Sequence, residues 1–380
     1  MTSNEDSFDA GDTELPDHPG RTRPARRAGR SVLRVRSVAD LLSLASVTLG
    51  FEPEESLVVI GVSGRQPGFQ VRVDLPRPGR AEDEGVALAE QVAAAVSAQG
   101  CTRVAVVAFS TRAAAAQVAE VTARHLERAG IELLDVLRSD GRRYWSLLCG
   151  DERCCPSAGT AYDPRSTSLR AEAALAGRVV LADRASLAAR FAAVDGPDRA
   201  VARRAALAAE DEVVAVVGLR NRGQVRRPTR RVIEAAVLPG APRVDVLLGR
   251  LLRAGGTVSA ERAAALAVWC SLVPLRDLAW SRMDRDSADV HLELWAAVAR
   301  QVVPPYEPAV LCLTAFAAWL SGDGASAWCA LDRCATVDPT YSMAGLIRET
   351  LERCLSPQLW VPLPRERAWA ACGVPRPDLG

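Results

Sequence analysis

In the first part of the chain, apolar segments typical of strands alternate with segments in which apolar residues recur at helical spacing. This pattern predicts strands and helices in turn. An apolar run at 56–62 is typical of a buried strand, and the alternating residues 69–74 fit its hairpin partner. Further strands are predicted at 103–109, 131–138 and 142–148, and helices near 37–49, 83–99, 113–129, 168–177 and 183–194. Because strands separated by helices become parallel neighbours and hairpins add antiparallel pairs, residues 35–197 are expected to form an α/β domain, a mixed sheet with packed helices.

The C-terminal part of the chain shows only the helical period. Apolar residues recur at helical spacing in successive segments. These segments are 244–253, 259–272, 274–283, 286–302, 306–320, 324–337 and 341–355. Short connections between them favour antiparallel packing, so residues 244–360 are expected to form an all-α helical-bundle domain.

In three segments the hydrophobic residues do not recur at a regular spacing. Residues 1–34 carry an acidic block and then a basic one, with proline and glycine, and are expected to be a disordered tail. Residues 361–380 are expected to be a second tail. Between 198 and 243, arginines cluster around Gly223 and Pro228, which favours an exposed, weakly ordered linker between the two domains.

Composition limits location and partners. The 380 residues are 49% hydrophobic and 24% charged with a net charge of +1, so a core can be buried while no global field attracts nucleic acid. No apolar run reaches the roughly 18 residues that a spanning helix requires, and the acidic N-terminus is the reverse of a secretory signal. We therefore expect a cytoplasmic protein that binds neither membrane nor nucleic acid, with its ten cysteines present as thiols.

The chain contains no lysine, and all 47 of its basic residues are arginine. A bacterial genome of high GC content explains this bias, together with the abundance of alanine, glycine and proline. Whatever its origin, the bias excludes a Walker-type phosphate loop with its lysine, a Schiff-base lysine, a pyridoxal enzyme and a lysine general base. No cofactor is expected.

The most concentrated reactive chemistry lies in one loop, where Cys149, Cys154 and Cys155 fall within seven residues. Three thiols, with a fourth ligand from elsewhere, can bind a soft metal. The C-x4-C-C spacing is poor for such a site, and Cys149 continues the alternation of the preceding strand, which directs its sulfur into the core. The sequence therefore predicts a structural loop of reduced thiols without metal.

Two charged pairs are further candidates for ligand binding. Arg72 and Asp74 alternate onto one face where a strand ends, so they could contact a ligand near the strand end. The alternative, which we favour, is turn chemistry that terminates the strand. Arg276 and Asp277 lie at a predicted helix start, where a structural ion pair is favoured over a site that binds an anion.

Two motif matches depend on their context. Residues 322–327 match the dinucleotide fingerprint G-x-G-x-x-A, but a helix rather than a strand is predicted before them, so we expect a turn between helices. Residues 311–339 are similar to one tetratricopeptide repeat. The positions that fit are Ala327, Leu331, Cys334 and Pro339. Because stacks need about three repeats, this similarity predicts a tetratricopeptide-like hairpin within a bundle and no binding array.

Several short motifs follow one another in a fixed order. They lie at 49–58 (LGFEPEESLV), 72–76 (RVDLP), 141–149 (GRRYWSLLC), 154–156 (CCP) with 159–160 (GT), 319–324 (WLSGDG) and 338–342 (DPTYS). This order resembles a bacterial family known as domain of unknown function 4192, over roughly residues 35–360. The resemblance implies one family unit and supplies no activity.

The sequence shows no recognisable catalytic constellation. His125 and His291 lie in different predicted domains, and no motif supports a histidine-based triad. The leading hypothesis is a cytosolic interaction or regulatory protein without catalytic activity, whose helical domain binds a protein partner. The alternative is an enzyme or small-ligand sensor that uses the strand ends near Asp74 and the loop at 149–155. A deep polar pocket over the sheet would favour the alternative, and an apolar groove on the helices would favour the interaction protein.

Overall fold

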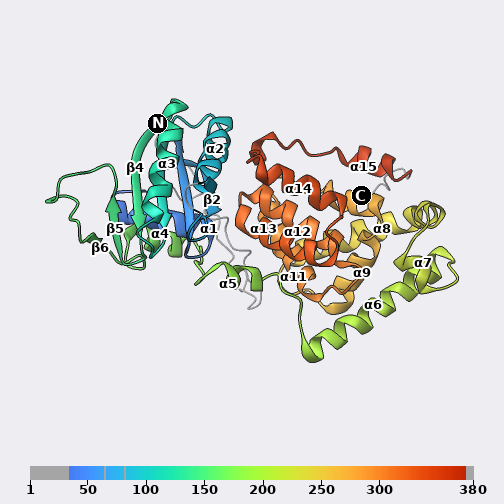
Figure 1. Ribbon diagram of the computed structural model, residues 1–380. Coiled ribbons are helices and arrows are strands. Elements are labelled where there is room, and N and C mark those ends of the chain that lie inside the picture. Colours follow the sequence, from blue (N-terminus) through green and yellow to red (C-terminus); the bar gives the residue numbers. More distant parts are fainter. Residues whose placement is uncertain (1–33, 64–65, 81–82, 374–380) are drawn as a thin grey trace, which may run out of the picture.

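The computed structural model describes residues 34–63, 66–80 and 83–373 (Figure 1). In this part of the chain, every strand of the sheet precedes residue 162. The elements up to residue 189 are α1 (Val38–Leu49), β1 (Ser56–Ser63), β2 (Gln66–Asp74), α2 (Asp83–Ala98), β3 (Arg103–Phe109), α3 (Ala115–Arg128), β4 (Glu132–Ser139), β5 (Arg143–Ser146), β6 (Thr160–Ala161), α4 (Ser168–Leu175) and α5 (Arg184–Ala189).

The six strands form one mixed sheet in the order β2-β1-β3-β4-β5-β6. Strands β3 and β4 are parallel, and each of the other neighbouring pairs is antiparallel. Helix α3 connects the parallel pair, as a crossover between parallel strands requires. The predicted mixed sheet with packed helices is confirmed.

Helices cover both faces of the sheet, which explains why its central strands are continuous apolar runs. On β1, Leu57 and Val59 pack with α2 and α3, whereas Val58 and Ile60 pack with α1, α4 and α5. All four side chains are at most 1% exposed. Burial on two faces therefore removes the polar alternation that a half-exposed strand would show.

The rest of the described chain is helical (Figure 1). Its elements are α6 (Gly196–Val217), α7 (Arg222–Arg226), α8 (Arg230–Ala254), α9 (Ala260–Cys270), α10 (Val273–Trp280), α11 (Ala288–Gln301), α12 (Glu307–Ser321), α13 (Gly324–Val337), α14 (Ser342–Glu352), the short 3-10 helix η1 (Pro357–Leu359) and α15 (Arg365–Ala371). A single hydrophobic cluster joins α6 through α15, and α12 lies at its centre with most of its side chains buried.

The segment 198–243 is not the weakly ordered linker expected from the sequence. It is occupied by α6, α7 and the first half of α8. The buried face of α6 is built largely from alanines, so its apolar stripe is weak in the sequence although the packing is close. The arginines that suggested solvent exposure form ion pairs, for example Arg226 with Glu210 and Arg222 with Asp211.

The tails are described only in part. Residues 1–33, expected to be a disordered tail, lie outside the described residues, as do 374–380. The expectation of a tail from 361 onward is wrong for α15, because its Trp369 is 1% exposed and belongs to the helical core. Ala368 and Cys372 are buried beside it, so these side chains together anchor the short helix.

The sheet and the helical part of the chain contact each other. Cys329 on α13 packs in the same hydrophobic cluster as α1, α4 and α5. An ion pair of 2.6 Å joins Arg184 on α5 to Asp332 on α13, and the amide of Val194 donates to the carbonyl of Arg300 at 2.8 Å. Helix α13 thus packs against the hydrophobic cluster on one face of the sheet. The comparison of the α12–α13 hairpin with a tetratricopeptide repeat stays a prediction.

Among the described residues, no single helix is long and apolar enough to cross a membrane. Helices α9 and α10 would be long and apolar enough only if they were taken together, and the chain bends by 114° between them.

Candidate functional site at the sheet edge

Polar residues from distant segments meet along one edge of the sheet. The strand registers place Asp74 opposite Ser56, Ser56 opposite Phe109, and Phe109 opposite Ser139. Strands β2, β3 and β4 end in this row, so the side chains that follow them gather at the carboxyl ends of the strands. Open α/β sheets bind their ligands at such edges.

Glu55 is the centre of this edge. Its carboxylate accepts a hydrogen bond of 2.6 Å from the Ser110 hydroxyl and one of 2.7 Å from Nε of Arg112. Arg112 in turn donates two bonds of 3.3 Å to the carbonyl of Pro76, which links the end of β3 to the segment after β2. We call Glu55, Asp74, Arg77, Ser110 and Arg112 the sheet-edge site.

The backbone of Glu55 is held in an uncommon conformation, with φ at +42°. A non-glycine residue in this left-handed region carries about 1–3 kcal/mol of strain and persists only where its surroundings hold it. Here the Glu55 carbonyl accepts the amide of Leu75 at 2.9 Å, and the Glu55 side chain is held by Ser110 and Arg112. Such strain concentrates at functional sites.

The carboxyl group of Glu55 is ionised at neutral pH. Burial acts to raise its pKa, but hydrogen bonds from Ser110 and Arg112 and the charge of Arg112 outweigh burial and lower the pKa below the ordinary value of 4.5. A carboxylate with a lowered pKa contributes stability above its unfolded pKa and loses it as the pH falls through the folded pKa.

This pH dependence of stability can be tested with Glu55→Gln. The variant is expected to be less stable than the wild type at pH 7. The difference is expected to shrink as the pH falls below about 4.5 toward the lower pKa of folded Glu55, because protonation of the wild-type carboxylate progressively removes the charge that distinguishes the two proteins. Urea denaturation at a series of pH values measures the difference. Glu54→Gln, at the exposed neighbouring position, is the control; a pH-independent difference for Glu55→Gln would contradict the ion-pair role of Glu55.

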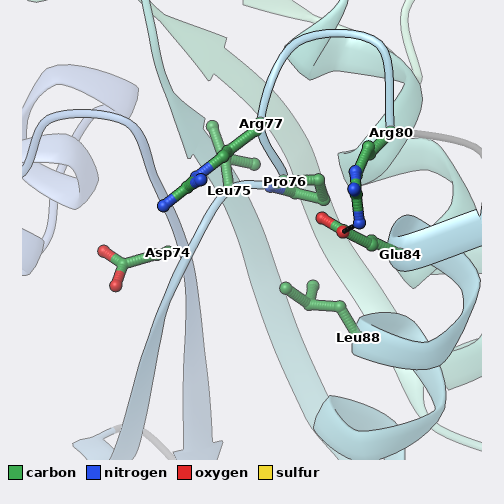
Figure 2. Close-up of a pocket in the computed structure, with 7 residues that line it drawn as sticks. All are labelled: Asp74, Leu75, Pro76, Arg77, Arg80, Glu84 and Leu88. Atoms are coloured by element: carbon green, nitrogen blue, oxygen red, sulfur yellow. Dashed lines mark hydrogen bonds and ion pairs between the residues drawn. The ribbon is translucent and has the colours of Figure 1, made fainter.

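A cavity of about 390 Å³ adjoins the sheet-edge site, and Figure 2 shows its lining. The walls come from the end of β2, the segment after it and the first turns of α2. The lining residues are Asp74, Leu75, Pro76, Arg77, Arg80, Glu84 and Leu88. Pro76 lines the cavity, and its carbonyl accepts hydrogen bonds from Arg112. The hydrogen-bonded group of Glu55, Ser110 and Arg112 therefore shares a wall with the cavity.

Most charges around the cavity are paired. Asp74 binds Arg72 at 2.6 Å, and Arg80 binds Glu84 at 3.2 Å. Arg77 is exposed and forms no ion pair within the described residues; Figure 2 shows its guanidinium extended toward Asp74 without a bond to it. Among the described residues that line the cavity, Arg77 therefore presents a guanidinium group without a charged partner.

The structure places the two sequence-predicted charged pairs differently. Asp74 lines the cavity, whereas Arg72 is mostly buried behind it and donates from Nε to Ser56 Oγ at 3.0 Å. Arg276 and Asp277 lie on α10, where they bind each other at 2.7 Å and Arg276 donates to the Tyr341 hydroxyl at 2.9 Å. Only Asp74 belongs to the sheet-edge site.

The prediction for Cys149 is wrong about where its sulfur points. Strand β5 ends at Ser146, so the alternation that would direct Cys149 into the core stops before that residue, and Leu148 is 55% exposed. Cys149 is half-buried, and its Sγ lies within 4.8 Å of those of Cys154 and Cys155. The three thiols therefore converge, which the sequence spacing did not predict.

The remaining motif matches have structural roles. Residues 322–327 form the turn between α12 and α13 and the start of α13, with Gly322 at φ +87°, and no strand precedes them. The predicted turn between two helices is thereby confirmed. His291 is 1% exposed on α11, and burial lowers its pKa to about 4.

Sequence reasoning missed Glu55, Ser110 and Arg112. Glu55 lies within the motif at 49–58, so the motif itself was the available signal. Ser110 and Arg112 follow β3, and a polar residue directly after a buried strand is the only local sign of them. Their meeting depends on strand register, which no local pattern reveals.

Comparison with known proteins leads to a family without an assigned activity. No curated protein and no solved structure matches the chain. The family described as "Domain of unknown function (DUF4192)" matches residues 39–358, a span that contains the sheet, the sheet-edge site and the helical part as far as η1. The chain therefore belongs to the DUF4192 family.

Proposed function

We propose that the chain binds a small anionic ligand at the sheet-edge site. The observation that carries this proposal is the cavity of about 390 Å³ next to the strand ends, with Arg77 in its wall. Arg77 forms no ion pair with another residue that the structure describes. Small-molecule sites typically occupy about 300–1,000 Å³ and present a few polar groups from several elements. The cavity fits the lower part of this range.

The charges favour an anion over a cation. Each carboxylate of the cavity wall already has an arginine partner, so a cation would have to compete with Arg72 or Arg80. Arg77 instead offers a planar, permanently charged guanidinium, which binds carboxylate or phosphate groups in a bidentate manner. The ligand of this proposal is a metabolite-sized carboxylate or phosphate.

Glu55 and Arg112 have a positioning role in this proposal. Arg112 holds the carbonyl of Pro76, a cavity residue, and Glu55 fixes Arg112. A ligand that orders the segment after β2 would thus be coupled to the strained Glu55 backbone. This arrangement supports a small-ligand sensor, and an enzymatic step is not part of the proposal.

A protein-binding surface on the helical part is a second proposal. Leu346 on α14 is 66% exposed, and Leu359 and Val361 beyond it are 68% and 79% exposed. Large apolar side chains exposed to solvent are typical of interaction surfaces when they form a contiguous patch. The hollow found on the helices is smaller, about 140 Å³, and polar groups such as Arg226 and Asp338 line it, so we rank this proposal second. For both, we propose a cytoplasmic protein without an organic cofactor or a nucleic-acid partner.

The first proposal is tested by thermal unfolding with inorganic phosphate, citrate and adenosine diphosphate. At least one anion is expected to raise Tm by a few degrees, since a ligand at 100 times its Kd stabilises by about 2.7 kcal/mol. Arg77→Gln is expected to abolish the shift while unfolding at the same temperature without ligand, because the Arg77 side chain is exposed.

The matched control is Arg128→Gln, at an exposed arginine at the end of α3. It should retain the full shift. Equal shifts for Arg77→Gln and wild type, or no shift with any of the three anions, would contradict the proposal. Reproducible capture of one protein from a native lysate, together with no anion effect, would favour the second proposal.

A further inference from the structure

The loop between β5 and β6 brings three thiols together away from the sheet-edge site. Sγ atoms of Cys149, Cys154 and Cys155 all lie within 4.8 Å of one another. In a tetrahedral zinc site with bonds of about 2.3 Å, neighbouring sulfurs are about 3.8 Å apart. The sulfurs therefore need to approach one another by at most about 1 Å to hold one ion.

The backbone of the loop places the two adjacent cysteines on one turn. The carbonyl of Asp151 accepts the amides of Cys154 at 3.0 Å and Cys155 at 2.7 Å, and its carboxylate accepts the amide of Arg153 at 2.9 Å. This turn folds the chain back so that the pair faces Cys149. The turn thereby allows both adjacent sulfurs to lie near that of Cys149.

The rest of the loop is tied to β5. Nε1 of Trp145 donates to the carbonyl of Ser157 at 3.0 Å, and Arg143 donates to the carbonyl of Gly159 at 2.8 Å. Gly159 lies against the Trp145 ring so closely that a Cβ there would come within 2.5 Å of it. Both ends of the loop are therefore held, and the thiols lie on the segment between them.

The other cysteines have a different environment. Six of them are buried, and the trio is absent from the hydrophobic clusters formed by the described residues. A buried cysteine acts as a small hydrophobe, but half-buried and exposed thiols contribute little packing. Packing therefore does not account for the convergence of three thiols in this loop.

From this geometry we propose that Cys149, Cys154 and Cys155 bind one Zn²⁺ ion as thiolates, with the fourth position open to solvent or to an incoming ligand. Thiolate sulfur selects soft and borderline ions such as Zn²⁺, and a site with three protein ligands is the arrangement that leaves a position open. The three thiol protons pass to solvent on binding, and no oxidant or reductant is required. The site is independent of the ligand proposed for the sheet edge.

The test uses the full chain, purified under reducing conditions without chelator or affinity tag. Elemental analysis is expected to find about one equivalent of zinc. Exchange for Co²⁺ is expected to produce thiolate-to-metal charge-transfer absorption and the intense visible bands of tetrahedral cobalt, which report sulfur ligation directly.

Serine variants locate the site. Cys149→Ser, Cys154→Ser and Cys155→Ser are each expected to weaken metal binding by at least about tenfold. Loss of a residue that only orients a ligand already weakens metal binding by about 10- to 100-fold, and these substitutions remove a ligand itself. Cys354→Ser is the matched control, since Cys354 is half-buried and lies outside the cluster, and it should bind as the wild type. Circular dichroism of the metal-free variants checks that they fold.

Two results would overturn the proposal. One is less than about a tenth of an equivalent of zinc in the wild type, with no cobalt charge-transfer band after reconstitution, because a thiolate site of this kind holds metal tightly at neutral pH. The other is a cobalt spectrum that survives all three cluster substitutions and disappears with Cys354→Ser.

Discussion

Glu210→Ala is expected to lower the free energy of unfolding by about 3 kcal/mol, because it removes the acceptor from a buried network. Glu210 lies on α6 with its side chain 2% exposed, and both of its oxygens bind Arg226, at 2.8 and 2.9 Å. The Tyr306 hydroxyl donates to the same carboxylate at 2.8 Å. Removal leaves the buried Tyr306 hydroxyl without its acceptor, whereas the Arg226 side chain is 46% exposed and can be solvated. This exposure keeps the loss at the lower end of the range of about 3–5 kcal/mol for broken buried pairs.

The next residue supplies a matched control. Asp211 forms a similar bidentate pair with Arg222, but their side chains are 56% and 41% exposed. Exposed pairs contribute about 0–1 kcal/mol, so Asp211→Ala should change stability little. Chemical denaturation of both variants measures the difference. Equal losses for the two variants would mean that burial does not distinguish the pairs and that α6 is less firmly packed than described.

Gly240→Val is expected to cost about 3 kcal/mol, the upper end of the usual cost of overpacking, because no space exists for a side chain at this point of α8. A Cβ at Gly240 would lie 2.5 Å from Cδ1 of Leu275 and 2.8 Å from Cε3 of Trp269. Both neighbours are buried, and the indole ring of Trp269 cannot bend away. The substitution must therefore separate α8 from α9 and α10.

Gly345→Val on α14 is the control for helix propensity. It is exposed, and a Cβ there meets nothing within 4 Å. Valine has a slightly better helix propensity than glycine, so the change should stay within about 0.5 kcal/mol. Thermal unfolding distinguishes the two variants. A small effect at both positions would show that α8 does not pack as closely as the Gly240 contacts require.

The family motifs and the periodic pattern predicted most elements but not the candidate site. The capped helix after Ser37, the buried strands and the helices from α9 to α14 follow from local spacing. The failures have two causes. The alanine-rich face of α6 and the Trp369 anchor of α15 depend on contacts with residues distant along the chain. The convergence of Cys149 with Cys154 depends on the geometry of the turn at Asp151, which the residue spacing does not specify.

The sequence by itself determined a mixed α/β sheet followed by helices, the absence of lysine chemistry and the family resemblance. Only the tertiary structure decided that Glu55, Ser110 and Arg112 meet beside a cavity, and that three thiols converge in one loop. The physical reason is that a periodic pattern reports which face of an element is buried, whereas register and turn geometry determine which distant side chains meet there.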